Sequence, residues 1–86
     1  MFEQVIFSPH ARTKLEVLRR HGFGIEEKEV VDVVRRPDKV IKGGKGRFIA
    51  QTVYNERHLI RVIYEARGKI AVVVTFYPAK RERYEG

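Results

Sequence analysis

The sequence predicts an α+β domain in which two N-terminal helices pack on one face of a mainly antiparallel sheet. Before Pro37, a short apolar strand is followed by two stretches with apolar residues at helical spacing. After Pro37 the pattern changes to short strands rich in β-branched and aromatic residues, separated by turns. The 86 residues suffice for one domain, 1–86, with a single modest core. The predicted order is therefore β-α-α-β-β-β-β.

The first helix has a clear start signal. Residues 2–7 (FEQVIF) are typical of a short, largely buried strand. Ser8 then accepts hydrogen bonds from the first free amides of a helix, and Pro9 occupies the first helical position, where no donor is needed. One face of this helix is apolar, with Ala11, Leu15 and Leu18 at helical spacing and Val17 beside them. Gly22 is expected to end the helix.

The second helix is predicted from "EEKEVVDVVRRP". With Glu26 as the N-cap, Glu29 takes the position whose side chain reaches back to the cap, and Ile25 packs on Val30 as a hydrophobic staple. The buried stripe consists of Val30, Val33 and Val34. Pro37 ends the helix, because the residue before a proline is disfavoured in helical conformation.

Four strands follow, at residues 40–41, 48–54, 59–65 and 70–77. The turn "KGGKG" at 42–46 and short hairpins at 55–57 and 67–68 connect them. The last strand is apolar on both of its alternating faces, which predicts a central place in the sheet but leaves its register open.

A polar stripe is predicted on one face of the sheet. Closing the hairpin at 55–57 on its flanking residues places Gln51 opposite Arg61 and Arg47 opposite Glu65. Because the helices cover the other face, Arg47, Gln51 and Arg61 are expected on the face where a site is accessible.

The chain is strongly basic, with a formal net charge of +7 and a pI near 10.1. Residues 1–43 carry nine Lys/Arg against seven Asp/Glu, and residues 44–86 carry nine against four. Such a charge attracts nucleic acid, an acidic protein partner or an anionic membrane surface. The positive surface is therefore expected mainly in the second half.

The C-terminal "YPAKRERY" combines basic and aromatic side chains directly after a core strand. Its cations, Lys80, Arg81 and Arg83, are suited to neutralising phosphates, and its tyrosines, Tyr77 and Tyr84, to stacking on unpaired bases. The alternative is a charged tail that serves only solubility.

Other motifs indicate what the chain lacks. "KGGKGR", with Lys42, Lys45 and Arg47, is either a solvated turn or a loop that contacts phosphates, and it is not a Walker A sequence. The histidines at 10, 21 and 58 and the two aspartates have no metal-ligand spacing, so no metal site is predicted. There is no cysteine, no signal-peptide pattern and no apolar run long enough to span a bilayer, so we expect a cytoplasmic protein.

The segment "FSPHARTKLEVLRRHGFGIEEKEVVDVVRRPDKV", with "GRFIAQ", "LIRVIYE" and "AVVVTFYP" after it, resembles a family of small prokaryotic proteins. That family is allied to the RelE/ParE toxin superfamily and, more distantly, to BrnT-like toxins. The resemblance spans nearly the whole chain. Its most specific pieces are the His-Ala-Arg start of the first helix, the "GIEEKEV" start of the second, and the Thr-x-Tyr-Pro end of the last strand.

The resemblance implies the RelE-like fold and a cytoplasmic toxin of a type II toxin–antitoxin pair, with an acidic antitoxin protein as its partner. RelE-like members cleave mRNA, commonly on the ribosome, without a metal or other cofactor. The ribose 2′-hydroxyl attacks the adjacent phosphate while basic side chains stabilise the developing charge. ParE-type relatives poison gyrase instead, so the resemblance alone leaves RNA and gyrase open as targets.

On this basis we predict an endoribonuclease. The expected catalytic residues are Arg47, Arg61, Tyr84, Lys45 and His58, and the expected RNA-binding residues are Lys42, Gln51, Tyr77, Lys80, Arg81 and Arg83. The two arginines of the polar stripe hold the scissile phosphate, and a tyrosine stacks a base or assists proton transfer. Lys45 and His58 are further candidates for acid or base.

A second interpretation is a non-catalytic module of the same fold that binds RNA or a protein partner. In that case Arg47 and Arg61 serve as cross-strand ion partners, and Glu65 is the expected mate of Arg47. An acidic antitoxin segment that covers the basic face is compatible with either interpretation.

Overall fold

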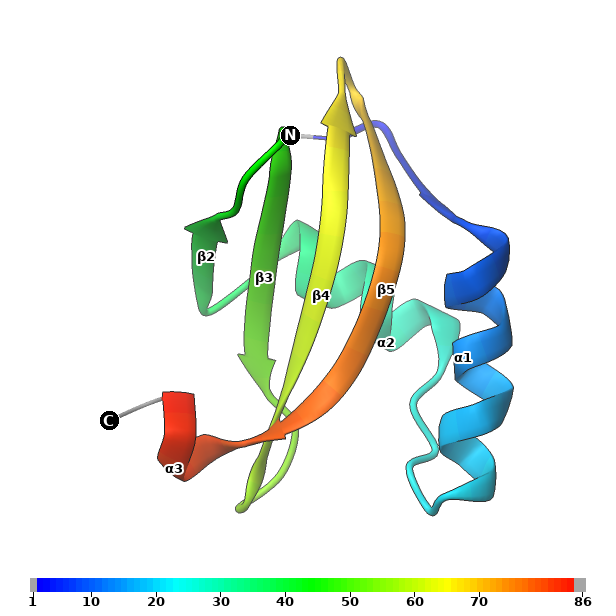
Figure 1. Cartoon of the computed structure of the whole chain (residues 1–86), viewed down its shortest axis with the longest axis vertical. Coiled ribbons are helices and arrows are strands. Elements are labelled where there is room, and N and C mark those ends of the chain that lie inside the picture. Colours follow the sequence, from blue (N-terminus) through cyan, green and yellow to red (C-terminus); the bar gives the residue numbers. More distant parts are fainter. Residues whose placement is uncertain (1, 85–86) are drawn as a thin grey trace.

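The computed structural model describes residues 2–84. Its elements are β1 (Gln4–Phe7), α1 (Pro9–Arg20), α2 (Glu27–Arg35), β2 (Lys39–Lys42), β3 (Arg47–Val53), β4 (His58–Arg67), β5 (Ile70–Lys80) and α3 (Arg81–Tyr84). The strands form one five-stranded sheet in the order β1-β5-β4-β3-β2, in which β1 is parallel to β5 and the other neighbours are antiparallel (Figure 1). The α+β class and the mainly antiparallel sheet are as predicted.

Both long helices begin where the sequence indicates. The Ser8 side chain accepts a hydrogen bond from the Ala11 amide at 3.1 Å, with Pro9 at the first helical position of α1. At the start of α2, the Glu29 carboxylate accepts a hydrogen bond from the Glu26 amide at 3.0 Å. No helix formed by residues 2–84 has the length and apolarity needed to cross a membrane.

Helices α1 and α2 cover one face of the sheet and enclose the core between themselves and the strands (Figure 1). The helices and their connection contribute Ala11, Leu18, Ile25, Val30, Val33 and Val34. The strands contribute Ala50, Ile60, Val62, Tyr64, Ala71, Val73 and Phe76. Because side chains alternate along a strand, the residues between these core positions point to the opposite face, called here the open face.

The strand register confirms the predicted cross-strand pairs and corrects the predicted place of the last strand. Gln51 lies opposite Arg61, and Arg47 lies opposite Glu65. The middle position of the sheet belongs to β4, whereas β5 is an inner strand between β4 and β1. Parallel pairing of β1 along β5 explains why β5 is apolar on both faces without being the middle strand.

The C-terminal end differs from the sequence prediction. Strand β5 continues to Lys80 rather than ending at Tyr77, and the next four residues form the short helix α3. Figure 1 shows the end of β5 curving across the sheet and carrying α3 in front of it. The basic C-terminal residues up to Tyr84 therefore belong to folded structure that lies over part of the open face.

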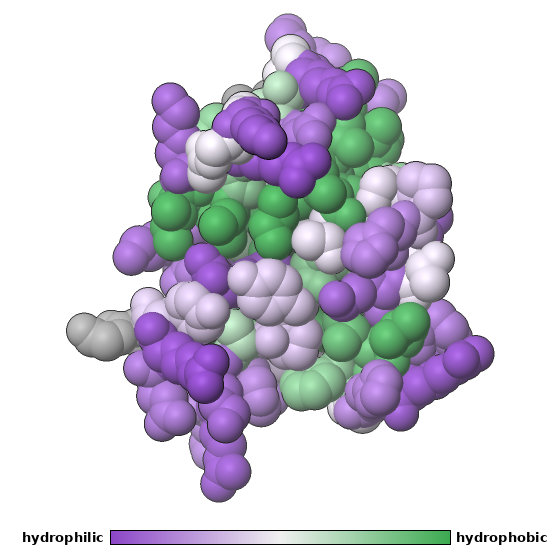
Figure 2. All heavy atoms as spheres, in the orientation of Figure 1, coloured by the Kyte–Doolittle hydropathy of each residue, from purple (hydrophilic) through white to green (hydrophobic). Residues whose placement is uncertain are grey.

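An apolar band crosses the open face, defined as Ile6, Ile41, Ile49, Ile63 and Val72. Ile41 pairs with Ile49, Ile49 with Ile63, and Ile6 with Val72, so the five strands each contribute one side chain. Ile6 is 45% exposed, and the other four are partly exposed. Figure 2 shows hydrophobic surface across this face, with hydrophilic surface above and below it.

Candidate functional site

A buried arginine lies at the centre of the candidate site. Arg61 projects from β4 onto the open face and is only 7% exposed. Its guanidinium carbon lies 4.1 Å from the centroid of the Tyr84 ring, which belongs to α3. On the neighbouring strand, the Tyr77 hydroxyl accepts a hydrogen bond from Arg61 Nη1 at 3.0 Å. Two tyrosines therefore hold the guanidinium, one through its ring and one through its hydroxyl.

The Arg61 charge has no acidic partner among residues 2–84. None of the ion pairs formed by the described residues includes Arg61, and its Nε has no hydrogen-bond acceptor there. Its cross-strand neighbour Gln51 is also buried, and Gln51 Oε1 has no donor among the described residues. Burying a charged group without a counter-charge costs several kcal/mol, so this arrangement is unfavourable for stability alone.

A groove runs between the end of β5 and α3. It has a volume of about 320 Å³ and is lined by Tyr77, Pro78, Ala79, Lys80, Arg83 and Tyr84. Two aromatic rings and two cations thus border one cavity next to the buried guanidinium. This combination suits a nucleotide, because rings stack on a base and cations neutralise phosphate. The structure brings these four predicted residues together.

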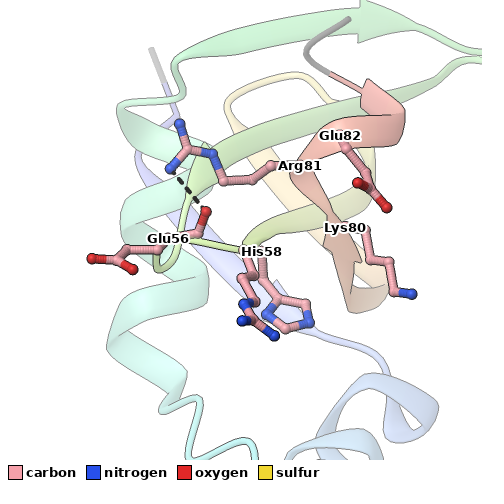
Figure 3. A pocket seen from close by; sticks show the side chains of 6 residues that line it. Glu56, His58, Lys80, Arg81 and Glu82 are labelled. Carbon is pink, nitrogen blue, oxygen red and sulfur yellow. Dashed lines mark hydrogen bonds between the residues drawn. The ribbon is translucent and has the colours of Figure 1, made fainter.

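A second cavity, called here the end cavity, shares Lys80 with the groove (Figure 3). Its volume is about 390 Å³, and it is lined by Glu56, Arg57, His58, Lys80, Arg81 and Glu82. The Arg81 amide donates to the Arg57 carbonyl at 2.9 Å, which ties α3 to the hairpin between β3 and β4. The Arg81 guanidinium lies 3.4 Å from the carbonyl oxygens of Asn55 and Glu56.

The side chains of His58 and Arg61 point to opposite faces of the sheet, so they do not contact the same part of a ligand. Arg61 points to the open face. His58 is two residues before the core residue Ile60, so its side chain points to the side of the sheet that the helices cover. There the His58 ring makes an edge-to-face contact with Phe23, with 5.2 Å between the ring centroids. The two positions are three residues apart on β4, about 10 Å along the strand. His58 therefore belongs to the end cavity, with Lys80 as its strand partner.

Three other predicted residues lie at the opposite end of the sheet. Lys42 ends β2, Arg47 begins β3, and Lys45 lies in the turn between them, which Figure 1 shows at the top, with α3 at the bottom. Arg47 is four residues from Gln51, about 13 Å along β3, and the apolar band crosses the strand between them. The structure therefore does not bring Arg47 and Arg61 together.

Arg47 has a structural partner. Its Nε lies 3.2 Å from the Glu65 carboxylate, and the Arg67 guanidinium lies 3.0 Å from the other oxygen of that carboxylate. Hydrogen bonds from Arg67 and then from Arg47 hold the pKa of Glu65 below its ordinary value. This ion pair is the one that the non-catalytic interpretation expects for Arg47.

Sequence reasoning missed Asn55 and the covering of Arg61 by α3. Asn55 begins the hairpin between β3 and β4, and its side-chain oxygen is the acceptor of three hydrogen bonds at 2.8–3.2 Å. Asn at a hairpin start is a recognisable turn signal, but it does not reveal a contact to a histidine. Within residues 2–84, no three His, Asp or Glu side chains are grouped so that they could hold a metal ion.

The fold is similar to that of a solved toxin. No protein-family model matches this chain, and no curated protein matches it significantly. The crystal structure of the Brucella abortus ribonuclease toxin BrnT superposes with a TM-score of 0.57 over 90% of this chain and 96% of that chain, at 20% sequence identity. At this level of identity the likeness shows that the two chains share a fold.

Proposed function

We propose that the protein is an endoribonuclease toxin of a toxin–antitoxin pair, with Arg61 as the residue that holds the scissile phosphate. The observation that carries the proposal is the buried Arg61 charge, which lacks an acidic partner among the described residues. A phosphodiester supplies the missing counter-charge. The shared fold with a protein described as a ribonuclease toxin supports the same activity.

The chemistry is attack by the ribose 2′-hydroxyl on the adjacent phosphorus. The new bond joins O2′ to phosphorus and the bond to O5′ breaks, which leaves a 2′,3′-cyclic phosphate and a 5′-hydroxyl. Arg61 stabilises the pentavalent transition state, whose charge exceeds that of the ground state. The proposal assigns no step to a metal ion.

In this proposal, Tyr77 gives a proton to the leaving oxygen. Arginine only donates hydrogen bonds, so the Tyr77 hydroxyl accepts from Arg61 and keeps its own proton for donation to O5′. The 2′-hydroxyl proton passes to solvent. Lys45 lies at the opposite end of the sheet and His58 faces the end cavity, so neither carries this transfer in the proposal.

The remaining predicted residues, apart from Arg81, bind the substrate in this proposal. Tyr84 stacks on a base at the groove, Lys80 and Arg83 meet flanking phosphates, and Arg81 braces the hairpin end. Gln51 lies opposite Arg61, and its side-chain oxygen, which has no donor among the described residues, serves in the proposal as an acceptor for the substrate. Lys42, Lys45 and Arg47 add salt-dependent attraction for the RNA at the far end of the open face. The substrate is mRNA, free or on the ribosome, and the expected location is the cytoplasm.

An RNA cleavage assay tests the proposal. We expect the purified protein to cleave free or ribosome-bound mRNA and to leave a cyclic phosphate. Arg61→Ala should lower the rate about 100- to 1,000-fold, the usual cost of removing one transition-state donor. Arg20→Ala is the matched control, because Arg20 is an exposed arginine of α1 that pairs with Glu16. Intact mRNA at high protein concentration would sink the nuclease proposal.

A second candidate function, partner binding without catalysis, is favoured by the apolar band and by the Arg47–Glu65 pair. Contiguous apolar surface beside positive charge suits an acidic amphipathic segment, such as that of an antitoxin, while the net charge of +7 disfavours a second copy of this chain. Ile49→Lys, on β3 within the band, should weaken co-purification with a short acidic protein encoded by the neighbouring gene. If the protein both cleaves RNA and binds the partner, the same variant should retain RNA cleavage. If the protein only binds the partner, neither the variant nor the native chain should cleave RNA.

A further inference from the structure

The side-chain oxygen of Asn55 determines which nitrogen of His58 carries the proton. Asn55 Oδ1 lies 2.9 Å from the Arg57 amide nitrogen, 2.8 Å from the His58 amide nitrogen and 3.2 Å from His58 Nδ1. Backbone amides only donate, so the Asn55 atom at this position is the carbonyl oxygen and acts solely as an acceptor. His58 Nδ1 must therefore donate the third hydrogen bond.

A neutral His58 consequently carries its proton on Nδ1 and has an unprotonated Nε2. The ring is also held by its edge-to-face contact with Phe23, whose plane is inclined by 82° to the imidazole. The orientation and the tautomer are thus both fixed by contacts within the chain. His58 offers one hydrogen-bond acceptor, and that acceptor selects a ligand group that donates.

The surroundings of His58 identify the rest of that ligand. Besides His58, the end cavity is lined by three cations, Arg57, Lys80 and Arg81, and by two carboxylates, Glu56 and Glu82, so positive charge exceeds negative charge around it. Figure 3 shows His58 and Lys80 beside one another, whereas Arg81 is directed to the Glu56 backbone. A volume of about 390 Å³ falls within the usual range for small-molecule sites. The cavity therefore suits a unit that carries both a phosphate and a hydroxyl donor.

We propose that the end cavity binds a ribose–phosphate unit of RNA and that His58 Nε2 accepts a hydrogen bond from its 2′-hydroxyl. Arg57 and Lys80 meet the phosphate of the same unit. Because DNA lacks the 2′-hydroxyl, His58 determines a preference for binding RNA over DNA. Asn55 is the residue that positions His58. This inference rests on RNA being the ligand of the proposed function, and it assigns His58 to recognition rather than to bond cleavage.

Lys80 connects this site to the groove that holds the base. It lines both cavities and is the last residue of β5, directly before α3. A strand with one base against Tyr77 and Tyr84 therefore reaches the end cavity with its adjoining ribose. Arg61 acts on the open face, so His58 and the scissile phosphate remain apart.

The experiment compares the affinities of the full chain for RNA, 2′-fluoro RNA and DNA of one short sequence. The 2′-fluoro sugar keeps the RNA-like pucker but cannot donate a hydrogen bond, so it isolates the contact to His58. We expect RNA to bind about three- to ten-fold more tightly than 2′-fluoro RNA, the usual worth of one hydrogen bond. His58→Phe should abolish this difference while leaving the affinity for 2′-fluoro RNA unchanged.

Two Asn55 variants separate positioning from a general structural effect. Asn55→Ala removes the acceptor that fixes the His58 tautomer and should reduce the difference between RNA and 2′-fluoro RNA. Asn55→Asp keeps an acceptor at the same place and should restore it. The matched control is His21→Phe, because His21 is exposed at the end of α1, away from the end cavity.

The outcomes also distinguish this inference from the proposed function. If His58→Phe retains the preference for RNA over 2′-fluoro RNA, the inference is wrong, whether or not the protein cleaves RNA. If the preference depends on His58 but mRNA stays intact, the recognition site stands and the nuclease proposal falls. Failure of all three oligonucleotides to bind would overturn both proposals.

Discussion

The guanidinium of Arg61 lies 4.1 Å from the ring of Tyr84, and this contact covers a charge that has no acidic partner among the described residues. The two residues come from the middle strand of the sheet and from a helix of four residues that follows the inner strand β5 and lies in front of the sheet (Figure 1). A buried charge that lowers the stability of the fold in this way is typical of a residue that serves function.

Replacing Arg61 by Met should stabilise the fold while abolishing RNA cleavage. Exchange of a buried charge that has no acidic partner within residues 2–84 for an apolar side chain of similar length is expected to raise the free energy of unfolding by about 1–3 kcal/mol. Urea unfolding monitored by circular dichroism measures this change. A clear loss of stability would instead mean that the contacts with Tyr77 and Tyr84 are worth more than the desolvation of the charge.

Two Tyr84 variants separate base stacking from proton transfer. Tyr84→Phe keeps the ring and should retain both RNA affinity and cleavage if Tyr84 only stacks. Tyr84→Ala removes the ring and should cost about 1–3 kcal/mol of RNA binding, measured by fluorescence anisotropy. A Tyr84→Phe variant that binds normally but cleaves poorly would assign a chemical role to the hydroxyl.

The Glu65 carboxylate should contribute stability that depends on pH. Its pKa is lowered first by the hydrogen bond from Arg67 and then by that from Arg47, so the folded protein binds this proton less tightly than the unfolded chain. The contribution is complete above the ordinary glutamate pKa and is lost as pH falls through the lower folded-state value. Unfolding curves of Glu65→Gln should therefore depend less on pH in this acid window than those of the native chain, and parallel profiles would contradict the linkage.

The Tyr64 phenol should contribute stability that is lost as pH rises, the opposite of the Glu65 contribution. Burial raises its pKa above the ordinary value of tyrosine, where its ring packs on Phe48 and Phe2. Its contribution to stability is full below the unfolded-state pKa and is lost as pH rises through the folded-state pKa. Tyr64→Phe should therefore reduce the alkaline loss of stability, which thermal unfolding above pH 10 measures. If Tyr64→Phe loses stability at alkaline pH as the native chain does, that loss arises from other groups.

Phe76 should be the most sensitive position of the core. It is fully buried on β5, in the same cluster as Val30 of α2 and Val62 of β4. Phe76→Ala leaves a cavity between the sheet and the helices and is expected to cost about 3–5 kcal/mol of unfolding free energy. Val17→Ala, at an exposed position of α1, is the control and should change stability little.

The sequence by itself determined the local elements and the pairing of the central hairpin. Ser8 and Pro9 start α1, the Glu26–Glu29 reach-back starts α2, and the short turn at 55–57 brings Gln51 opposite Arg61. These features depend on residues close together in the chain, where spacing and turn chemistry limit the alternatives. The α+β class follows from the same local patterns.

Only the tertiary structure decided which of the candidate residues meet. Arg47 and Arg61 share a face, yet about 13 Å of strand and the apolar band separate their cross-strand pairs. His58 and Arg61 share a strand but point to opposite faces, because strand side chains alternate. Tyr84 reaches Arg61 because β5 continues to Lys80 and bends over the sheet. Such long-range contacts depend on strand length, curvature and packing, and no local pattern encodes them.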